Sequence, residues 1–172
     1  MGEVTMQRSS VVGFVLFIIP LCSVFSQNDV ASLRWHQWDE GVVAAHTAGK
    51  FMLVDVYTDW CSWCKKLDKS VYVHPQVQEL LAAHFIPVKL NAESEDKLTN
   101  GAQQYTEQQW AKLLDVKGYP TILVFDSQFQ LVARYAGYLD AYNFILLLNF
   151  VTGKYYTQYS FQEYLHSVHD DQ

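Results

Sequence analysis

Basic residues are scarce in this sequence, and their scarcity narrows the possible functional classes. The 172 residues contain 12 lysines and arginines against 18 aspartates and glutamates, which gives a net charge of −6 and a pI near 5.4. A protein that binds nucleic acid usually presents a basic stripe to the phosphates, and no such stripe is present. No glycine-rich segment of the kind that cradles phosphate is present either. Nucleic acid is therefore not an expected partner.

Cysteine is also rare. The chain has Cys22, Cys61 and Cys64, and the last two are separated by only two residues. A single Cys-x-x-Cys pair supplies half of a four-ligand zinc site, and no second pair exists. The other ligands would have to come from histidines scattered along the chain: His36, His46, His74, His84, His166 and His169. We therefore expect no metal and no cofactor. A purely structural disulfide is a further alternative, but its loop is too short to constrain much of the unfolded chain.

The longest apolar run is too short to span a membrane. Residues 11–25 form a run of about 15 residues that Pro20 interrupts, whereas a spanning helix needs about 20. Arg8 precedes the run and the small residue Ser26 ends it, a pattern typical of secretory signals. We predict that residues 1–26 are a signal peptide cleaved after Ser26. The protein is then exported, either to the periplasm or as a secreted protein, without stable membrane insertion.

Three alternatives to this prediction are open. Initiation at Met6 would give a more ordinary signal, and the run could stay uncleaved as a membrane anchor. A lipid could also be attached at Cys22, although the bulky Leu21 stands where lipoprotein signals normally have a small residue. If cleavage follows Ser26, the mature chain keeps one isolated cysteine pair. In an oxidising compartment, such a pair is either a structural bond or a catalyst.

Hydrophobic periodicity and end signals predict one α/β domain without internal repeats. A hydrophobic content of 50% is enough for one core. After a short leader at residues 27–32, we expect helices at 35–45, 61–70, 74–84, 106–115 and 140–151, and strands at 51–57, 85–90, 121–125 and 130–135.

Two segments lie outside this pattern. The polar stretch 91–105 has the composition of an exposed loop, and we expect it to have no chemistry of its own. Residues 152–172 form a tyrosine-rich tail, in which Ser160-Phe-Gln-Glu163 matches a capping box. The tail should therefore contain a short helix that ends near Val168.

The order of the elements and three short strings resemble the thioredoxin family. Val54-Asp-Val-Tyr-Thr-Asp-Trp-Cys61 resembles the family's approach to its active site, and Val88-Lys-Leu-Asn91 resembles its next core strand. Gly118-Tyr-Pro-Thr121 resembles the loop whose proline is cis and faces the cysteines. The resemblance implies a thioredoxin fold over residues 33–151. This is an α/β fold with a central mixed sheet flanked by helices, here with an N-terminal signal segment and a C-terminal helical extension.

The cysteine pair is the candidate catalytic centre. A helix N-terminus stabilises a thiolate, so Cys61 is the expected nucleophile, being nearest to that end and the more exposed of the two. Cys64 should resolve the mixed disulfide that Cys61 forms. Asp55, on a core strand, could accept the Cys64 proton because burial raises the pKa of a carboxyl group, and Lys89 could pair with Asp55. The alternatives are that Asp55 is a solvated strand-end residue and Lys89 an ordinary surface lysine.

Four residues around the pair are candidates for substrate binding. Trp60 and Trp63 flank Cys61, and Trp63 offers a hydrophobic contact to partner polypeptides unless it packs against the first helix. A cis Pro120 would leave the backbone of Tyr119 open to pair with an extended substrate strand. Thioredoxins usually have Gly-Pro between their cysteines, so the Ser-Trp found here leaves the redox potential open.

Three functions are compatible with these residues. The first is an exported thiol–disulfide oxidoreductase that reduces protein disulfides and receives electrons from a membrane donor. The second is an oxidant or isomerase that uses the same site, since potentials within the fold span about 150 mV. The third is a non-catalytic interaction module. We favour reduction over oxidation, because Asp55 and Lys89 suit the deprotonation of a resolving thiol and the sequence resembles small exported thioredoxin-like proteins more than oxidants with a large inserted helical domain. The retention of both cysteines argues against the non-catalytic module.

Overall fold

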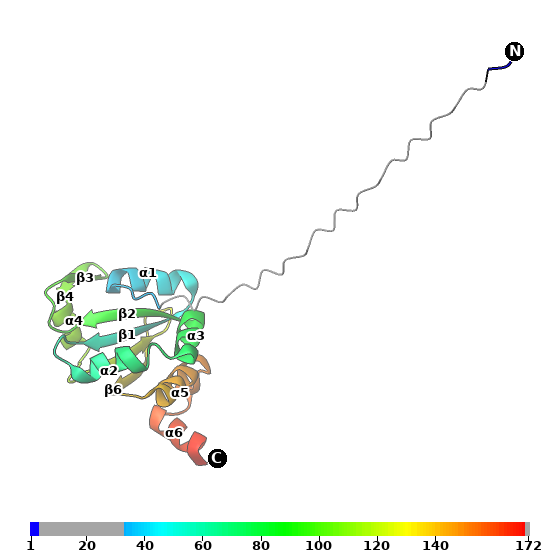
Figure 1. Cartoon of the computed structure of the whole chain (residues 1–172). Coiled ribbons are helices and arrows are strands. Elements are labelled where there is room, and N and C mark those ends of the chain that lie inside the picture. Colours follow the sequence, from blue (N-terminus) through cyan, green and yellow to red (C-terminus); the bar gives the residue numbers. More distant parts are fainter. Residues whose placement is uncertain (4–32, 171–172) are drawn as a thin grey trace.

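A four-stranded mixed sheet forms the centre of the molecule (Figure 1). The computed structural model describes residues 1–3 and 33–170, so the predicted leader, Cys22 and nearly all of the predicted signal peptide lie outside the described residues. Across the sheet the strands lie in the order β2-β1-β5-β6. In chain order their bounds are β1 (Phe51–Tyr57), β2 (Phe85–Asn91), β5 (Thr121–Phe125) and β6 (Leu131–Ala136). The predicted fold class is confirmed.

Strand direction places several chain segments at one edge of this sheet. β1 runs parallel to β2 and antiparallel to β5, and β5 runs antiparallel to β6. As a result the C-terminal ends of β1, β2 and β6 lie together with the N-terminal end of β5. We call this end of the strands the site edge. In the sheet register, Asp55 of β1 lies directly beside Lys89 of β2.

Helices cover both faces of the sheet. Side chains alternate along a strand, so Met52, Val54 and Val56 point to one face and Leu53 to the other. The first face packs against α1 (Trp38–Ala48) and α4 (Glu107–Leu113), and the second against α2 (Ser62–Ser70), α3 (Pro75–His84) and α5 (Ala141–Thr152). Asp55, two residues beyond Leu53, therefore points to the face that α2 covers.

The helix ends follow the expected signals. α1 stops at Gly49, whose φ of 63° lies in the left-handed region that glycine tolerates. α3 begins with Pro75 at its first position. α4 begins with the complete capping box of Thr106 and Gln109, and the Asp140 side chain caps α5 by accepting the Asn143 N–H.

The first helix starts later than predicted. Trp35 and Trp38 fit one helical stripe in the sequence, but α1 begins only at Trp38. Residue His36 instead adds to the free edge of β2: its N–H donates to the Pro87 carbonyl at 2.9 Å, and its carbonyl accepts the Lys89 N–H at 3.2 Å. Trp35 and Trp38 consequently pack on opposite faces of the sheet.

The prediction of an exposed loop at 91–105 was wrong, because this segment forms most of a β-hairpin. β3 (Lys97–Asn100) pairs antiparallel with β4 (Gln103–Thr106) through a two-residue turn in which Gly101 has a φ of 62°. Leu98 is buried and Tyr105 packs against the core beside it. Gly101 stands at the first central position of this turn, where a type II′ hairpin favours glycine, and it could have revealed the hairpin.

The C-terminal extension predicted from the sequence is present. A short 3-10 helix, η1 (Tyr155–Thr157), is followed by α6 (Phe161–Asp170). The capping box is formed: Ser160 N–H donates to Glu163 Oε2 at 2.7 Å, and Glu163 N–H donates to Ser160 Oγ at 3.3 Å. Phe150 of α5 contacts the rings of Phe161 and Tyr164, which holds α6 against the domain.

Candidate active site

The cysteine pair lies at the site edge and is joined by a disulfide bond. β1 ends at Tyr57, and after a short turn Cys61 becomes the N-cap of α2. The Cys61 sulfur accepts the backbone N–H of Cys64 at 3.0 Å. Because the N-terminus of a helix carries a partial positive charge, a thiolate at Cys61 would be stabilised in this position.

Exposure does not distinguish the two sulfurs in the oxidised protein. Cys61 is 3% exposed and Cys64 is 2% exposed, so both are buried and the expected difference in exposure is negligible in the disulfide form. The disulfide turns the Cys61 sulfur towards Cys64, which lies on the buried face of α2 together with Leu67. The N-cap position of Cys61 is the feature that separates the two.

Asp55 is completely buried, which excludes the solvated strand-end alternative. Its Oδ2 accepts a hydrogen bond from Lys89 Nζ at 2.6 Å, whereas its Oδ1 has no hydrogen-bond partner among the described residues. Burial raises the pKa of Asp55, and the Lys89 cation only partly offsets this effect. The carboxyl therefore binds a proton more tightly than an exposed aspartate does.

Lys89 is held by two carboxylates rather than one. Its Nζ lies 2.6 Å from Asp55 Oδ2 and 2.6 Å from Asp68 Oδ1, and its side chain is only 19% exposed, so it is not an ordinary surface lysine. Burial alone would lower the pKa of Lys89, but the two aspartates reverse this and raise it. Sequence reasoning missed Asp68, although its position four residues after Cys64, on α2, was a usable signal.

Aromatic rings complete the surroundings of Lys89. Its Nζ lies 4.7 Å, 5.1 Å and 5.2 Å from the ring centres of Trp35, Tyr57 and Tyr72. The Tyr72 hydroxyl is buried without a formed hydrogen bond, and burial together with the Asp55 charge raises the pKa of Tyr72. The Lys89 ammonium group thus lies among three aromatic rings as well as two carboxylates.

Trp60 is the most exposed of the predicted site residues, at 66%. Its indole Nε1 donates to Glu93 Oε1 at 2.9 Å, and its ring meets Tyr119 edge-on with centres 5.9 Å apart. Glu93 belongs to the segment that we expected to lack chemistry of its own. This segment instead contacts the tryptophan that precedes Cys61.

Trp63 is 52% exposed and does not use the first helix as its ring partner. Its ring lies 5.2 Å from that of Tyr138, between β6 and α5. Lys66 Nζ lies over both rings, 4.9 Å from the centre of Trp63 and 4.7 Å from that of Tyr138. The alternative of packing against the first helix was therefore wrong.

Pro120 is buried at the start of β5, and the Tyr119–Pro120 peptide bond is cis. The Pro120 carbonyl accepts the Gly137 N–H at 2.8 Å, and Thr121 Oγ1 donates to the Gly118 carbonyl at 2.7 Å. Tyr119 stays partly exposed. These bonds fix the loop at the site edge, where the disulfide also lies.

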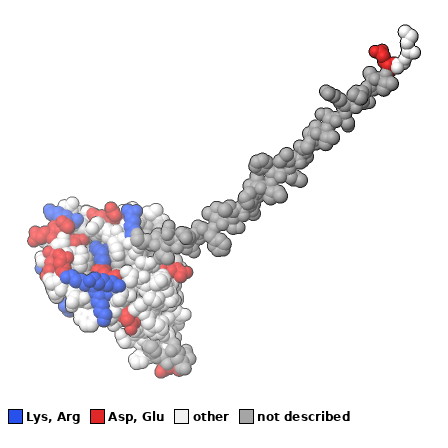
Figure 2. Space-filling model, viewed as in Figure 1, with Lys and Arg blue, Asp and Glu red and all other residues white. Residues whose placement is uncertain are grey.

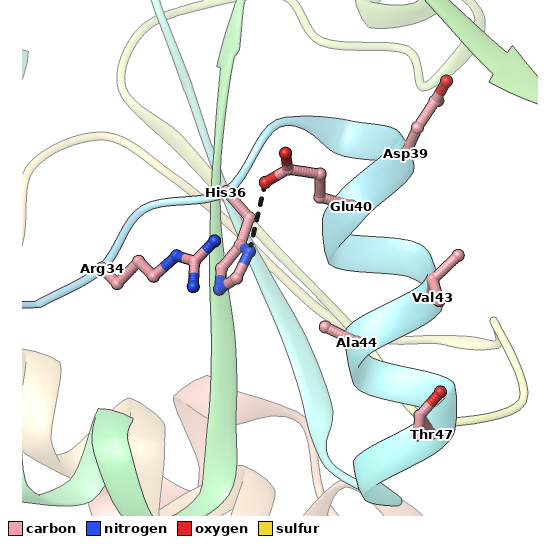
Figure 3. A pocket seen from close by; sticks show the side chains of 7 residues that line it. All are labelled: Arg34, His36, Asp39, Glu40, Val43, Ala44 and Thr47. Carbon is pink, nitrogen blue, oxygen red and sulfur yellow. Dashed lines mark ion pairs between the residues drawn. The ribbon is translucent and has the colours of Figure 1, made fainter.

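A shallow pocket elsewhere contains none of the predicted site residues. It has a volume of about 660 Å³ and runs along the outer side of α1 (Figure 3). In it, His36 Nδ1 lies 3.6 Å from Glu40 Oε2. Within residues 1–3 and 33–170, no group of three His, Cys, Asp or Glu side chains is arranged to hold a metal ion.

Comparison with known proteins gives a family for most of the described chain. Residues 38–152 match a family model described as a thioredoxin-like domain. A solved thioredoxin-fold protein from Helicobacter pylori superimposes with a TM-score of 0.61 at 17% identity, covering 73% of this chain and 88% of that one. At this identity the similarity shows the fold alone.

Curated relatives are longer proteins. The thiol:disulfide interchange protein DsbD of Photorhabdus laumondii is 33% identical over 122 residues, which cover 69% of this chain and 20% of that protein. DsbD of Escherichia coli strain K12 is 41% identical over 98 residues, or 56% of this chain and 16% of that protein. The chain thus spans a fifth or less of the length of these two relatives. None of the helices in the part of the chain that the structure describes is long and apolar enough to cross a membrane.

Proposed function

Because the chain belongs to the thioredoxin-like family, we propose that it is an exported thiol–disulfide oxidoreductase that reduces disulfide bonds in other proteins. The observation that carries the proposal is the Cys61–Cys64 disulfide, with Cys61 capping the N-terminus of α2. The names of the curated relatives, which are thiol:disulfide interchange proteins, support it.

The reaction consists of two exchanges. In the reduced protein, the Cys61 thiolate attacks one sulfur of a substrate disulfide, forming a mixed disulfide and releasing the other substrate sulfur as a thiolate. The Cys64 thiolate then attacks the Cys61 sulfur, forming the Cys61–Cys64 disulfide and releasing the second substrate thiolate. The substrate gains two electrons and takes up two protons, and the protein loses two electrons.

Asp55 is the proposed base for the second exchange. Cys64 is buried and must lose a proton before it can attack, and a buried carboxylate with a raised pKa is suited to accept that proton. Both groups belong to the layer between α2 and the sheet, since Cys64 shares its helix face with Leu67, and Leu67 packs with Leu53. Lys89 acts through Asp55, because its cation favours the ionised carboxylate.

Four residues are proposed to receive the substrate. Trp60 and Trp63 are large exposed apolar side chains beside Cys61, where a partner polypeptide would cover them. Tyr119 and Pro120 form a fixed loop at the same edge, and the backbone of Tyr119 can pair with an extended substrate segment. Because this pairing uses main-chain hydrogen bonds, it can bind substrate segments of many sequences.

The predicted signal peptide supports export to the periplasm or beyond. Because exported compartments are oxidising, a reductase there needs a source of electrons that restores the two thiols after each cycle. We propose a membrane protein as this electron donor and protein disulfides as the substrates.

A single-turnover reaction tests this function. Reduced, desalted protein is mixed with excess insulin, and the new insulin thiols are counted after an acid quench. We expect one insulin disulfide to be reduced per protein molecule, and the mass of the protein to fall by two hydrogens as Cys61 and Cys64 join. The double variant Cys61→Ser with Cys64→Ser is the control. Thiol release no higher than in this control would contradict the proposed reduction and favour an oxidant or a non-catalytic interaction module.

A further inference from the structure

We propose that two oppositely charged aromatic clusters flank the disulfide and select substrate segments with a basic residue on one side of the reacting cysteine and an acidic residue on the other. The acidic cluster consists of Trp60, Tyr119 and Glu93. The basic cluster consists of Trp63, Tyr138 and Lys66. This inference rests on the proposed function and gives it a substrate class.

The acidic cluster is tied together by direct contacts. The Trp60 indole donates to the Glu93 carboxylate at 2.9 Å, and Tyr119 packs edge-on against Trp60. Glu93 stays exposed, and so does Asp59, the residue before Trp60. A partner that covers the Trp60 ring therefore meets negative charge immediately beside it.

The basic cluster also joins two aromatic rings to one charged side chain, here a cation. Lys66 Nζ lies over the rings of both Trp63 and Tyr138, and Ser70 Oγ lies 3.4 Å from the Tyr138 hydroxyl. Lys65 and Lys69 are exposed on the same helix. None of these three lysines lies within 4.0 Å of a carboxylate among the described residues, so their charges are not neutralised by an ion pair.

Strand order puts Glu93 of the acidic cluster and Tyr138 of the basic cluster on opposite sides of the cysteines. Glu93 follows β2, the outer strand on one side of the sheet, and Tyr138 follows β6, the outer strand on the other side. Cys61 follows β1, which lies between these strands, and all three strands end at the site edge. Figure 2 shows basic side chains over α2, with acidic side chains gathered beside them towards α4 and the β3–β4 hairpin.

The arrangement gives the docked segment a preferred orientation. An aromatic ring on each side offers apolar contact to any polypeptide, but a charged side chain meets attraction on one side and repulsion on the other. A segment with a basic residue facing Glu93 and an acidic residue facing Lys66 satisfies both clusters. The reversed segment places like charges together on both sides.

Three peptides test the inference. Each has one cysteine, held as a mixed disulfide with 2-mercaptoethanol. The first has lysine two residues before the cysteine and glutamate two residues after it, the second has the reverse order, and the third has serine at both positions. Reduced wild-type protein should reduce the two charged peptides at second-order rates that differ about three- to tenfold at 20 mM salt. The difference should shrink towards unity at 0.5 M salt, where exposed charges are screened.

A charge exchange between the clusters provides the decisive variant. Glu93→Lys combined with Lys66→Glu keeps the net charge and should reverse the order of the two charged peptides. Glu79→Lys combined with Lys112→Glu, both at exposed positions away from the clusters, should keep the wild-type order. Circular dichroism checks the fold of each variant.

The outcomes separate this inference from the proposed function. Reversal of the preference in the cluster variant alone supports the inference. Equal rates for the two charged peptides, or a preference that the exchange leaves unchanged, would overturn it while the neutral peptide still reports reductase activity. If the wild-type protein reduces none of the three peptides, the proposed function fails and the inference falls with it.

Discussion

The Cys64→Ser variant is expected to accumulate mixed disulfides with its substrate proteins. Cys61 occupies the N-cap of α2 and can still attack a substrate disulfide, but a serine hydroxyl cannot displace the substrate from Cys61. The release step is therefore lost, and the covalent intermediate persists. We expect most of the variant to be trapped under conditions where the wild-type protein shows only a few per cent of such adducts.

Non-reducing gels and mass spectrometry of the adducts measure this effect. Peptide mapping should place the substrate on Cys61, and the adducts should disappear with dithiothreitol. Cys61→Ser is the matched control, because it keeps one thiol at the buried Cys64 position. Adducts formed by Cys61→Ser but not by Cys64→Ser would reverse the assigned roles, and equal trapping by both variants would show that the two cysteines do not have separate roles.

The Asp55→Asn variant should slow the release step about 100-fold near neutral pH. General base catalysis contributes about 10²- to 10⁴-fold, and asparagine keeps the shape of the aspartate side chain without accepting a proton. In the wild-type protein, release should slow as the pH falls through the raised pKa of Asp55, because the protonated carboxyl cannot act as a base. The pH–rate profile of the variant should lack this fall in rate at low pH, which we call the acid limb.

Stopped-flow measurements on a preformed mixed disulfide isolate the release step. Lys89→Met provides a second readout: without the cation that lowers the pKa of Asp55, the acid limb should move to higher pH. Glu79→Gln, an exposed carboxylate on α3, is the control and should leave the profile unchanged. An unchanged acid limb in Asp55→Asn would show that another group takes the Cys64 proton.

Local signals predicted the centre of the fold well. The apolar run at 51–57 is a fully paired central strand, and the residues from Cys61 to Ser70 are the capped helix that follows it. Asp55, Lys89 and the cysteines could be selected because each lies on a core strand or at a helix start within a short recognisable string. The structure then added the ion pair that joins Asp55 to Lys89.

The remaining parts of the site depend on contacts between distant segments. Glu93 reaches Trp60 across 33 positions, and Tyr138 meets Trp63 only because β6 ends at the site edge. No local periodicity reports such contacts. Trp35 was misassigned for a similar reason, since pairing of the neighbouring His36 with the β2 edge overrode a plausible helical spacing.

The redox potential of the Cys61–Cys64 couple determines whether electrons flow from this protein to its substrates. The purified protein is equilibrated with a series of dithiothreitol or glutathione buffers, and its thiols are quantified after alkylation. If the protein is a reductase, its potential should lie near that of thioredoxin, about −270 mV. A value near that of the oxidant DsbA, about −120 mV, would instead make the protein an oxidant of its substrates.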